Sequence, residues 1–189
     1  HAKFGVQFKV EYFERKLPNT SVNICKYLSS GAIKGIGPAL AKKIVDVFGE
    51  QTLEIMEKEP RRLLEIKGIS PKKCDSIAEE VQKIFNLRHL MIYLSEFGLK
   101  AGIAMRAYQL WGRQAIEMIK ANPYCLCDNY IGLSFKKAEE VAGEMNIPSD
   151  SHKRIEAGFI YLLSENANAG HSCIPIDVFE KLACTYLKI

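Results

Sequence analysis

The sequence predicts a mainly α-helical protein in which a unit of two glycine-containing turns between helices occurs twice. From about Asn19 onward, apolar residues recur at helical spacing, and four similar turns separate the helical stretches. Landmarks in the first half of the chain also recur in the second half at a nearly constant offset, which is the mark of an internal repeat. One β-strand is expected before the helices.

That strand is predicted within residues 4–12, where apolar residues alternate with mostly polar ones: Phe4, Val6, Phe8, Val10 and Tyr12. One strand is not stable alone. It is therefore expected either to pack on the helices that follow or to be the last strand of a sheet formed upstream, and we favour the upstream sheet. Residues 1–19 are assigned to this terminal strand.

The first turn between helices combines glycine, proline and lysine. Gly35 and Gly37 permit positive φ, and between them Ile36 is expected to plug the turn into the core. Pro38 suits the first position of the next helix. Such a turn leaves free backbone N–H groups at a helix N-terminus, where a phosphate can bind. Three cationic side chains stand nearby: Lys34, Lys42 and Lys43.

The other three turns depart from this pattern. The second has Gly68 but Ser70 in place of the second glycine, and the third has Gly98 with Lys100 at that place. The fourth has Gly132 and Ser134. Lysine pairs follow the second and fourth turns: Lys72 and Lys73, then Lys136 and Lys137.

Each turn could simply join two helices and touch nothing else. The agreement of glycines, proline and lysines favours a binding role for the first turn, and Lys72 and Lys73 favour one for the second. The third is interpreted as structural. The fourth stays open, because Phe135 stands where proline would.

The repeat rests on four landmarks in one register. Three pairs are 63 residues apart and the last is 64 apart: Gly35 and Gly98, Gly49 and Gly112, Pro60 and Pro123, Gly68 and Gly132. One residue inserted near Asn129 accounts for the last value. We therefore predict one two-turn unit over 20–86 and a second over 87–149. Phe48 and Trp111 occupy matching positions and are interpreted as core residues rather than platforms for bases.

The run Pro148–Ser151 marks the next boundary. Residues 150–189 are predicted to form a helix ending near Gly170, a short strand at 172–175 and a further helix. This order is how a winged-helix module begins.

Composition is that of a globular protein, with 48% hydrophobic and 25% charged residues. The formal net charge of +4 is uneven: residues 1–90 carry 16 Lys and Arg against 11 Asp and Glu, and residues 91–189 carry 10 against 11. A mildly basic first half permits a polyanionic partner. The six cysteines form no C-x-x-C pair, so we expect reduced thiols in a cytoplasmic protein. The apolar stretches are only a few residues long, so we expect no membrane segment.

No catalytic pattern accompanies the turns. There is no G-x-x-x-x-G-K-[ST], H-E-x-x-H or G-x-S-x-G segment, so no enzymatic activity is predicted for these residues and no catalytic residue is named. A zinc site can be imagined at Cys125, Cys127, His171 and Cys173. The C-x-C spacing is not that of a usual zinc motif, so no metal site is predicted.

The G-h-G-x-x-x-A segment at Gly35–Ala41 resembles the helix-hairpin-helix motif, whose members bind the DNA backbone without sequence specificity. The order of segments in the whole chain is similar to the N-terminal region of RecD-like ATP-dependent DNA helicases, the exodeoxyribonuclease V alpha-chain-like proteins. The resemblance is carried by residues 3–10, Tyr27–Gly37, Asn122–Tyr124 and Gly132 with Phe135–Lys136. In that family an OB-like segment, helix-hairpin-helix repeats and a winged-helix-like stretch precede the motor core.

The resemblance implies an accessory fragment of a 5′→3′ helicase of DNA repair and recombination. Its partners would be single-stranded or forked DNA and the downstream motor core, which would bind ATP and Mg²⁺. The implied DNA-binding residues are Lys34, Gly35, Ile36, Gly37, Ala39, Lys42, Lys43, Gly68, Ser70, Lys72, Lys73, Gly132, Ser134, Lys136 and Lys137. The chain departs from the family pattern in the three later turns, where Ser70, Lys100 and Ser134 replace the second glycine. The alternative is a helical protein–protein scaffold that binds no DNA.

Overall fold

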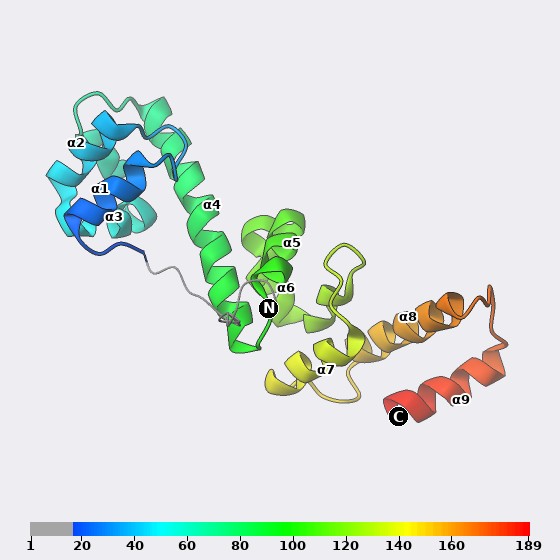
Figure 1. Ribbon diagram of the computed structural model, residues 1–189. Coiled ribbons are helices and arrows are strands. Elements are labelled where there is room, and N and C mark those ends of the chain that lie inside the picture. The colour runs from blue at the N-terminus through cyan, green and yellow to red at the C-terminus, as the bar shows by residue number, and fades with distance from the viewer. Residues whose placement is uncertain (1–16) are drawn as a thin grey trace, which may run out of the picture. The chain divides into compact units, whose positions relative to one another are not determined.

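A computed structural model describes residues 17–189, and every regular element in that range is helical (Figure 1). The chain divides between Gln82 and Lys83 into two compact units. Helix α4 (Pro71–Glu96) runs through this division without a break, and so through the boundary predicted between residues 86 and 87. The strand predicted within residues 4–12 lies outside the described residues. No helix in the described part of the chain has the length and apolar character needed to cross a membrane.

The first unit contains two helical hairpins joined by short connectors. Its elements, which lead into α4, are α1 (Ser21–Ser29), α2 (Pro38–Phe48), η1 (Gly49–Gln51), α3 (Thr52–Lys58) and η2 (Pro60–Glu65). Helix α1 packs on α2. Fully buried aliphatic side chains form the core of this unit, among them Ile24, Leu28, Ile44, Leu63 and Ile77.

Polar contacts hold the first half of α4 against α3 and η2 of the first unit. The Gln82 side-chain amide donates to the Glu57 carbonyl (2.7 Å), and the Cys74 thiol donates to the Pro60 carbonyl (3.3 Å). The Arg62 guanidinium lies 5.3 Å from the centre of the Phe48 ring. Phe48 is buried, as expected for a core residue.

The second unit repeats the order of the first. After the end of α4 come α5 (Ala101–Trp111), η3 (Gly112–Gln114), α6 (Ala115–Ala121), η4 (Pro123–Cys127) and α7 (Phe135–Glu144). Helices α2 and α5 each have 11 residues, and α3 and α6 each have 7. The core of this unit includes Leu94, Ala104, Ile119 and Leu126, with Trp111 packed against it.

The two connectors also share their backbone conformation. Gly49 has φ 56° and ψ −132°, and Gly112 has φ 54° and ψ −131°. Positive φ with this ψ is open chiefly to glycine. Both glycines therefore stand where the backbone requires them, 63 residues apart, and the internal repeat read from the sequence is present in the fold.

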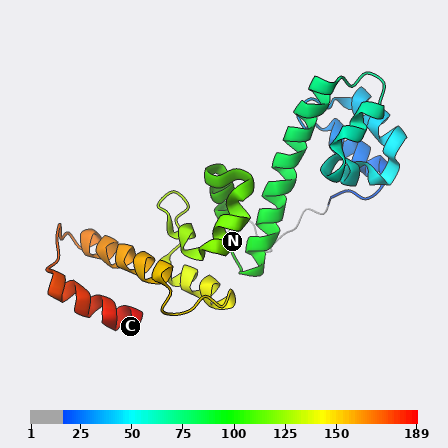
Figure 2. The same ribbon diagram turned by 180° about the vertical axis from the view of Figure 1, so that it is seen from behind.

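The C-terminal segment is a pair of helices, α8 (His152–Asn168) and α9 (Ile176–Leu187), which lie side by side in both views (Figures 1 and 2). Phe159 and Phe179 meet edge to face at 5.2 Å between ring centres. At Gly158 the helices approach so closely that a Cβ atom would lie 2.5 Å from a methyl carbon of Leu187. Phe135 of α7 stacks on Tyr161 (5.3 Å), which joins this pair to the hairpins of the second unit.

The short strand predicted at residues 172–175 is wrong, and the winged-helix interpretation loses its support with it. The Asn166 side-chain amide donates to the carbonyls of His171 and Cys173 (3.4 Å each). These two carbonyls therefore bond to a side chain of α8 and not to a neighbouring strand. Pro175 lies at the N-cap of α9. Four residues carried too little pattern to distinguish a strand from an irregular connection.

Candidate nucleic-acid interface

The first hairpin turn has the conformation that its glycine and isoleucine predict. Gly35 has φ 91°, a value that L side chains rarely adopt, and a Cβ there would still have room, 3.7 Å from the Ile77 side chain. Ile36 is 4% exposed and plugs the turn into the core. Gly37 differs from the expectation, because its φ is −96°. Positive φ is therefore not the reason for glycine at position 37.

Gly37 leaves the N-terminus of α2 without a side-chain cap. It is the N-cap of α2 and offers no side-chain acceptor, and Pro38 has no N–H to satisfy. The first amide bonded into the helix is that of Ala41, which donates to the Gly37 carbonyl (2.9 Å). The amides of Ala39 and Leu40 have no partner within the helix, and they add to the positive end of its dipole.

The second turn closes its helix end with its own side chain. Gly68 has φ 102° and Ile69 is buried, as at the first turn. Ser70, however, is the residue before α4, and its hydroxyl accepts a hydrogen bond from the Lys73 amide (3.3 Å). This is the ordinary capping interaction of serine. The α4 N-terminus consequently has one amide fewer to offer an external anion than that of α2.

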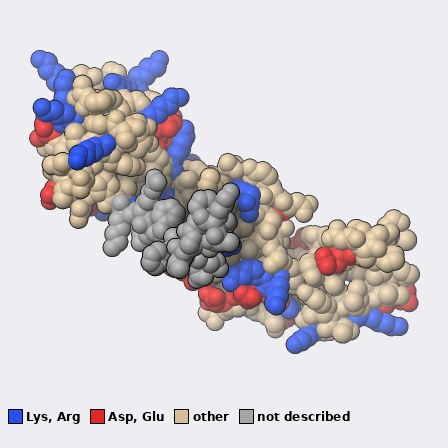
Figure 3. Space-filling view, in the orientation of Figure 1, with Lys and Arg blue, Asp and Glu red and all other residues tan. Residues whose placement is uncertain are grey.

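Lysines of the first unit gather around both turns, all exposed: Lys34, Lys42, Lys43, Lys67, Lys72 and Lys73. Figure 3 shows basic side chains projecting from this unit. None of the six makes an ion pair within residues 17–189. Three other cations of this unit do: Lys58 with Glu54 (2.8 Å), Arg61 with Asp75 (3.1 Å) and Arg62 with Glu65 (2.9 Å). Apart from Lys26 in α1, the cations of this unit's described residues that lack an ion pair thus lie beside the two turns.

The fourth turn resembles the second, but one of its two lysines is paired with a carboxylate. Gly132 has φ 70°, and the Ser134 hydroxyl accepts from the Lys137 amide (3.3 Å). The Lys137 ammonium pairs with Glu140 (2.7 Å), and this hydrogen bond lowers the pKa of Glu140. Phe135, which replaces the proline, is a core residue. Lys136 is exposed.

The third turn also has a helix end without a side-chain cap, but it lacks the lysine pair of the other turns. Gly98 has φ 65° and Leu99 is buried as the plug, so the turn keeps the backbone geometry of the others. Lys100 occupies the N-cap position of α5, but its side chain accepts no hydrogen bond from the helix. The Lys100 carbonyl accepts from the Ile103 amide (2.9 Å). No lysine pair follows on α5, and the structural interpretation of this turn stays a prediction.

Comparison with known proteins matches both units. The family model described as the HHH domain of the ATP-dependent RecD2 DNA helicase matches residues 83–173, and that of the SAM-like helix-hairpin-helix tandem matches residues 27–83. A curated relative, the ATP-dependent RecD2 DNA helicase of Deinococcus radiodurans, is 23% identical over 193 residues. The chain carries a RecD-like helix-hairpin-helix region. No solved structure matches it.

The relative is much longer than this chain. The alignment covers 100% of the chain but 27% of the Deinococcus protein. The RecD-like region therefore corresponds to about a quarter of the length of that helicase.

Sequence reasoning placed the DNA-binding candidates of this region on three turns, and in the structure each turn brings its glycine, its N-cap and its lysines together. Ile36 is the exception among the candidates, since its side chain is buried and only its backbone could face a ligand. Lys67 was missed. It precedes Gly68 as Lys34 precedes Gly35, so the repeat itself could have identified it.

The residues of the imagined zinc site, Cys125, Cys127, His171 and Cys173, do not come together in one cluster. Among the described residues, no group of three or more His, Cys, Asp or Glu side chains is placed to hold an ion. Burial raises the pKa of the Cys125 thiol to about 12 and that of Cys127 to about 11. Both therefore remain neutral thiols at physiological pH.

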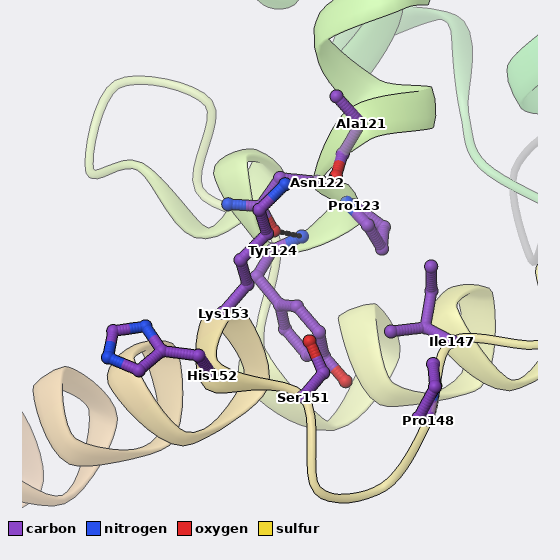
Figure 4. A pocket seen from close by; sticks show the side chains of 9 residues that line it. All are labelled: Ala121, Asn122, Pro123, Tyr124, Ile147, Pro148, Ser151, His152 and Lys153. Atoms are coloured by element: carbon purple, nitrogen blue, oxygen red, sulfur yellow. Dashed lines mark hydrogen bonds between the residues drawn. The ribbon is translucent and has the colours of Figure 1, made fainter.

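A pocket of about 250 Å³ lies where η4 meets the connection between α7 and α8 (Figure 4). The Lys153 ammonium donates to the Ala121 carbonyl at its edge (2.7 Å), and the Asn122 side chain accepts from the Tyr124 amide (3.1 Å). These contacts occupy the Lys153 ammonium and the Asn122 side-chain oxygen, and the lining also includes Ser151 and His152. The lining contains no carboxylate or thiol, and we assign it no chemistry.

Proposed function

We propose that the RecD-like region binds the sugar–phosphate backbone of DNA without sequence preference, as an accessory region of an ATP-dependent 5′→3′ helicase acting in repair and recombination. The observation that carries the proposal is the surface around the first turn. There an uncapped α2 N-terminus adjoins lysines that have no carboxylate partner in the described structure. Phosphate oxygens can accept from the free amides while ammonium groups neutralise the strand.

The first turn is proposed as the principal contact and the second as a supporting one. Ser70 occupies an amide at the second turn, whereas Gly37 leaves the corresponding amide of Leu40 free. Single-stranded or forked DNA in the cytoplasm is the proposed ligand. ATP and Mg²⁺ belong to the motor core of the proposed longer protein, and no residue of this chain is assigned to them.

Fluorescence anisotropy with labelled single-stranded, duplex and forked DNA at several salt concentrations tests the proposal. The informative variant is Lys42→Gln/Lys43→Gln. Its matched control is Lys58→Gln/Arg61→Gln, which removes the same charge from cations that already pair with Glu54 and Asp75. On duplex, the plot of log affinity against log salt should become shallower by about 0.9 for each phosphate that the first variant no longer neutralises. The control should keep the parent slope.

A folded parent protein that binds none of these DNAs at low salt would overturn the proposal. In that case the second candidate function gains support, a helical scaffold for other proteins. The observation that favours a scaffold is the apolar surface of the C-terminal helix pair, where several side chains are exposed: Ile160, Leu163, Val178, Leu182 and Tyr186. Equal weakening by both double variants would mean that net charge, rather than the first turn, attracts the DNA.

A further inference from the structure

The turn before α7 is one residue longer than its counterpart before α4, and the longer turn holds an exposed aromatic ring. The offset between the repeats is 63 residues up to Pro123 and 64 from Gly132 onward. The extra length lies in the loop between η4 and α7, which Figure 1 shows as an open connection. Tyr130 lies in this loop and is 52% exposed.

Hydrogen bonds hold Tyr130 in place although it is not buried. Its amide donates to the Asp128 carboxylate (2.8 Å), and its hydroxyl donates to the Gln109 side-chain oxygen on α5 (2.5 Å). Arg106, also on α5, donates through Nε to the carbonyl of Ile131 (2.8 Å). The Ile131 side chain is fully buried in the core of the second unit. Helix α5 therefore fixes both the loop and the ring.

This arrangement leaves an apolar ring surface in water while the protein satisfies the polar end of the side chain. An immobilised ring loses little entropy when a flat partner stacks on it. At the same turn the Asp128 carboxylate accepts from the Tyr130 amide, and Lys137 pairs with Glu140. Lys136 is exposed and has no ion-pair partner in the described residues. An exposed cation in the first turn of α7, the helix that this loop enters, suits a ligand that carries phosphates beside flat bases.

We propose that Tyr130 is a stacking platform for an unpaired base of single-stranded DNA at the fourth turn. The proposal rests on the proposed function and extends it, because it assigns the strand form that the second unit prefers. Stacking needs an accessible base face, which a duplex offers only at its ends. Aromatic stacking accepts every base, so the absence of sequence preference is retained.

The test measures the binding of a labelled dT12 strand and of a duplex with hairpin-closed ends. The variant Tyr130→Ala removes the ring, and Tyr130→Phe keeps the ring but removes the hydroxyl that bonds Gln109. Loss of stacking should weaken dT12 binding at least about fivefold for Tyr130→Ala, with duplex affinity unchanged. Tyr130→Phe should remain within about twofold of the parent on both DNAs. Trp111 emission, which reports the packing of the second unit, checks that each variant is folded.

A second readout observes the contact directly. In Trp111→Phe/Tyr130→Trp, the indole at position 130 is the sole tryptophan, and dT12 should quench its emission whereas the closed duplex should not. Unchanged dT12 affinity in Tyr130→Ala, or an equal loss on the closed duplex, overturns the stacking role and leaves backbone binding intact. A parent protein that binds the duplex but not dT12 also overturns the stacking role alone. Binding of neither DNA overturns both proposals.

Discussion

The guanidinium of Arg154 in α8 holds the carboxylate of Glu139 in α7 through two of its nitrogens, with Nε 2.9 Å from Oε1 and Nη2 2.8 Å from Oε2. The third nitrogen, Nη1, donates to the carbonyls of Ser149 (2.7 Å) and Leu187 (3.0 Å). The Tyr124 hydroxyl completes the group by donating to Glu139 (2.6 Å). One arginine thus ties the C-terminal helix pair to the last hairpin.

Replacing Arg154 by methionine should destabilise the second unit substantially. The side chains of Arg154 and Glu139 are only 12% and 30% exposed, so the variant would leave a partly buried carboxylate without its cation. We expect a loss of about 2–3 kcal/mol in the free energy of unfolding, somewhat below the cost for a fully buried pair. Urea denaturation followed by the emission of Trp111, the single tryptophan, measures it in this unit.

The matched control is Glu117→Gln, which breaks the exposed pair of Glu117 with Lys120 (3.3 Å) in the same unit. Exposed pairs contribute little, so its unfolding free energy should stay within about 0.5 kcal/mol of the parent. Equal effects of Arg154→Met and Glu117→Gln would show that the Arg154 contacts do not stabilise the junction.

The Glu139 carboxylate should make the stability of the second unit depend on pH. Burial raises its pKa, but the hydrogen bonds from Arg154 and Tyr124 lower it by more, and the net shift is downward. Its contribution to stability is therefore fully present above the unfolded-state pKa of about 4.3 and is lost as pH falls through the lower folded-state value. The parent should be more stable than Glu139→Gln at pH 7, with a smaller difference near pH 3 in Trp111-monitored denaturation.

Other carboxylates also titrate between these pH values, so the informative quantity is the difference between the parent and Glu139→Gln. Glu117→Gln again provides the comparison, since its difference from the parent should remain small at every pH. A gap for Glu139→Gln that stays constant from pH 7 to pH 3 would contradict the assignment of this titration to Glu139.

Residue types with one strong conformational preference made the hairpins predictable from sequence. Gly35, Gly68 and Gly132 all have positive φ, and Ile36 is buried between helices, because few other choices satisfy such a turn. The repeat could be found for the same reason, since Gly49 and Gly112 must both adopt a conformation open chiefly to glycine.

Features that depend on distant partners were not predictable. Residues 172–175 resemble a strand because nothing local shows that the Asn166 side chain takes two of their carbonyls. The pairing of Glu139 with Arg154 has no sequence signature either, since 15 residues and a boundary separate them. At the candidate interface, the sequence pointed to every lysine beside the turns except Lys67, but the capping of α4 by Ser70 depends on a side-chain orientation.

Alanine at Gly132 should destabilise the second unit through backbone strain alone. Gly132 has φ 70°, and an added Cβ would meet only the Asn129 carbonyl oxygen at 3.9 Å, an ordinary contact. The expected cost is about 1–2 kcal/mol in Trp111-monitored denaturation. Gly143→Ala gives the opposite sign, because Gly143 is helical and its Cβ would meet nothing within 4 Å. It should stabilise by roughly 0.5 kcal/mol, and destabilisation by both variants to the same extent would contradict the strain argument.

Serine at position 37 should separate the capping of α2 from its proposed DNA contact. The backbone of Gly37, with φ −96° and ψ 174°, suits any residue, and an added Cβ would meet nothing within 4 Å. In Gly37→Ser the hydroxyl should accept from the Leu40 amide, as Ser70 does from Lys73, and the helix should be unchanged or slightly more stable. With that amide occupied, DNA affinity measured by anisotropy should fall about threefold to tenfold, the worth of one hydrogen bond. Gly37→Ala adds a side chain without an acceptor and should bind within about twofold of the parent. If serine bound DNA as tightly as alanine does, the free amides of α2 would not be what holds the phosphate.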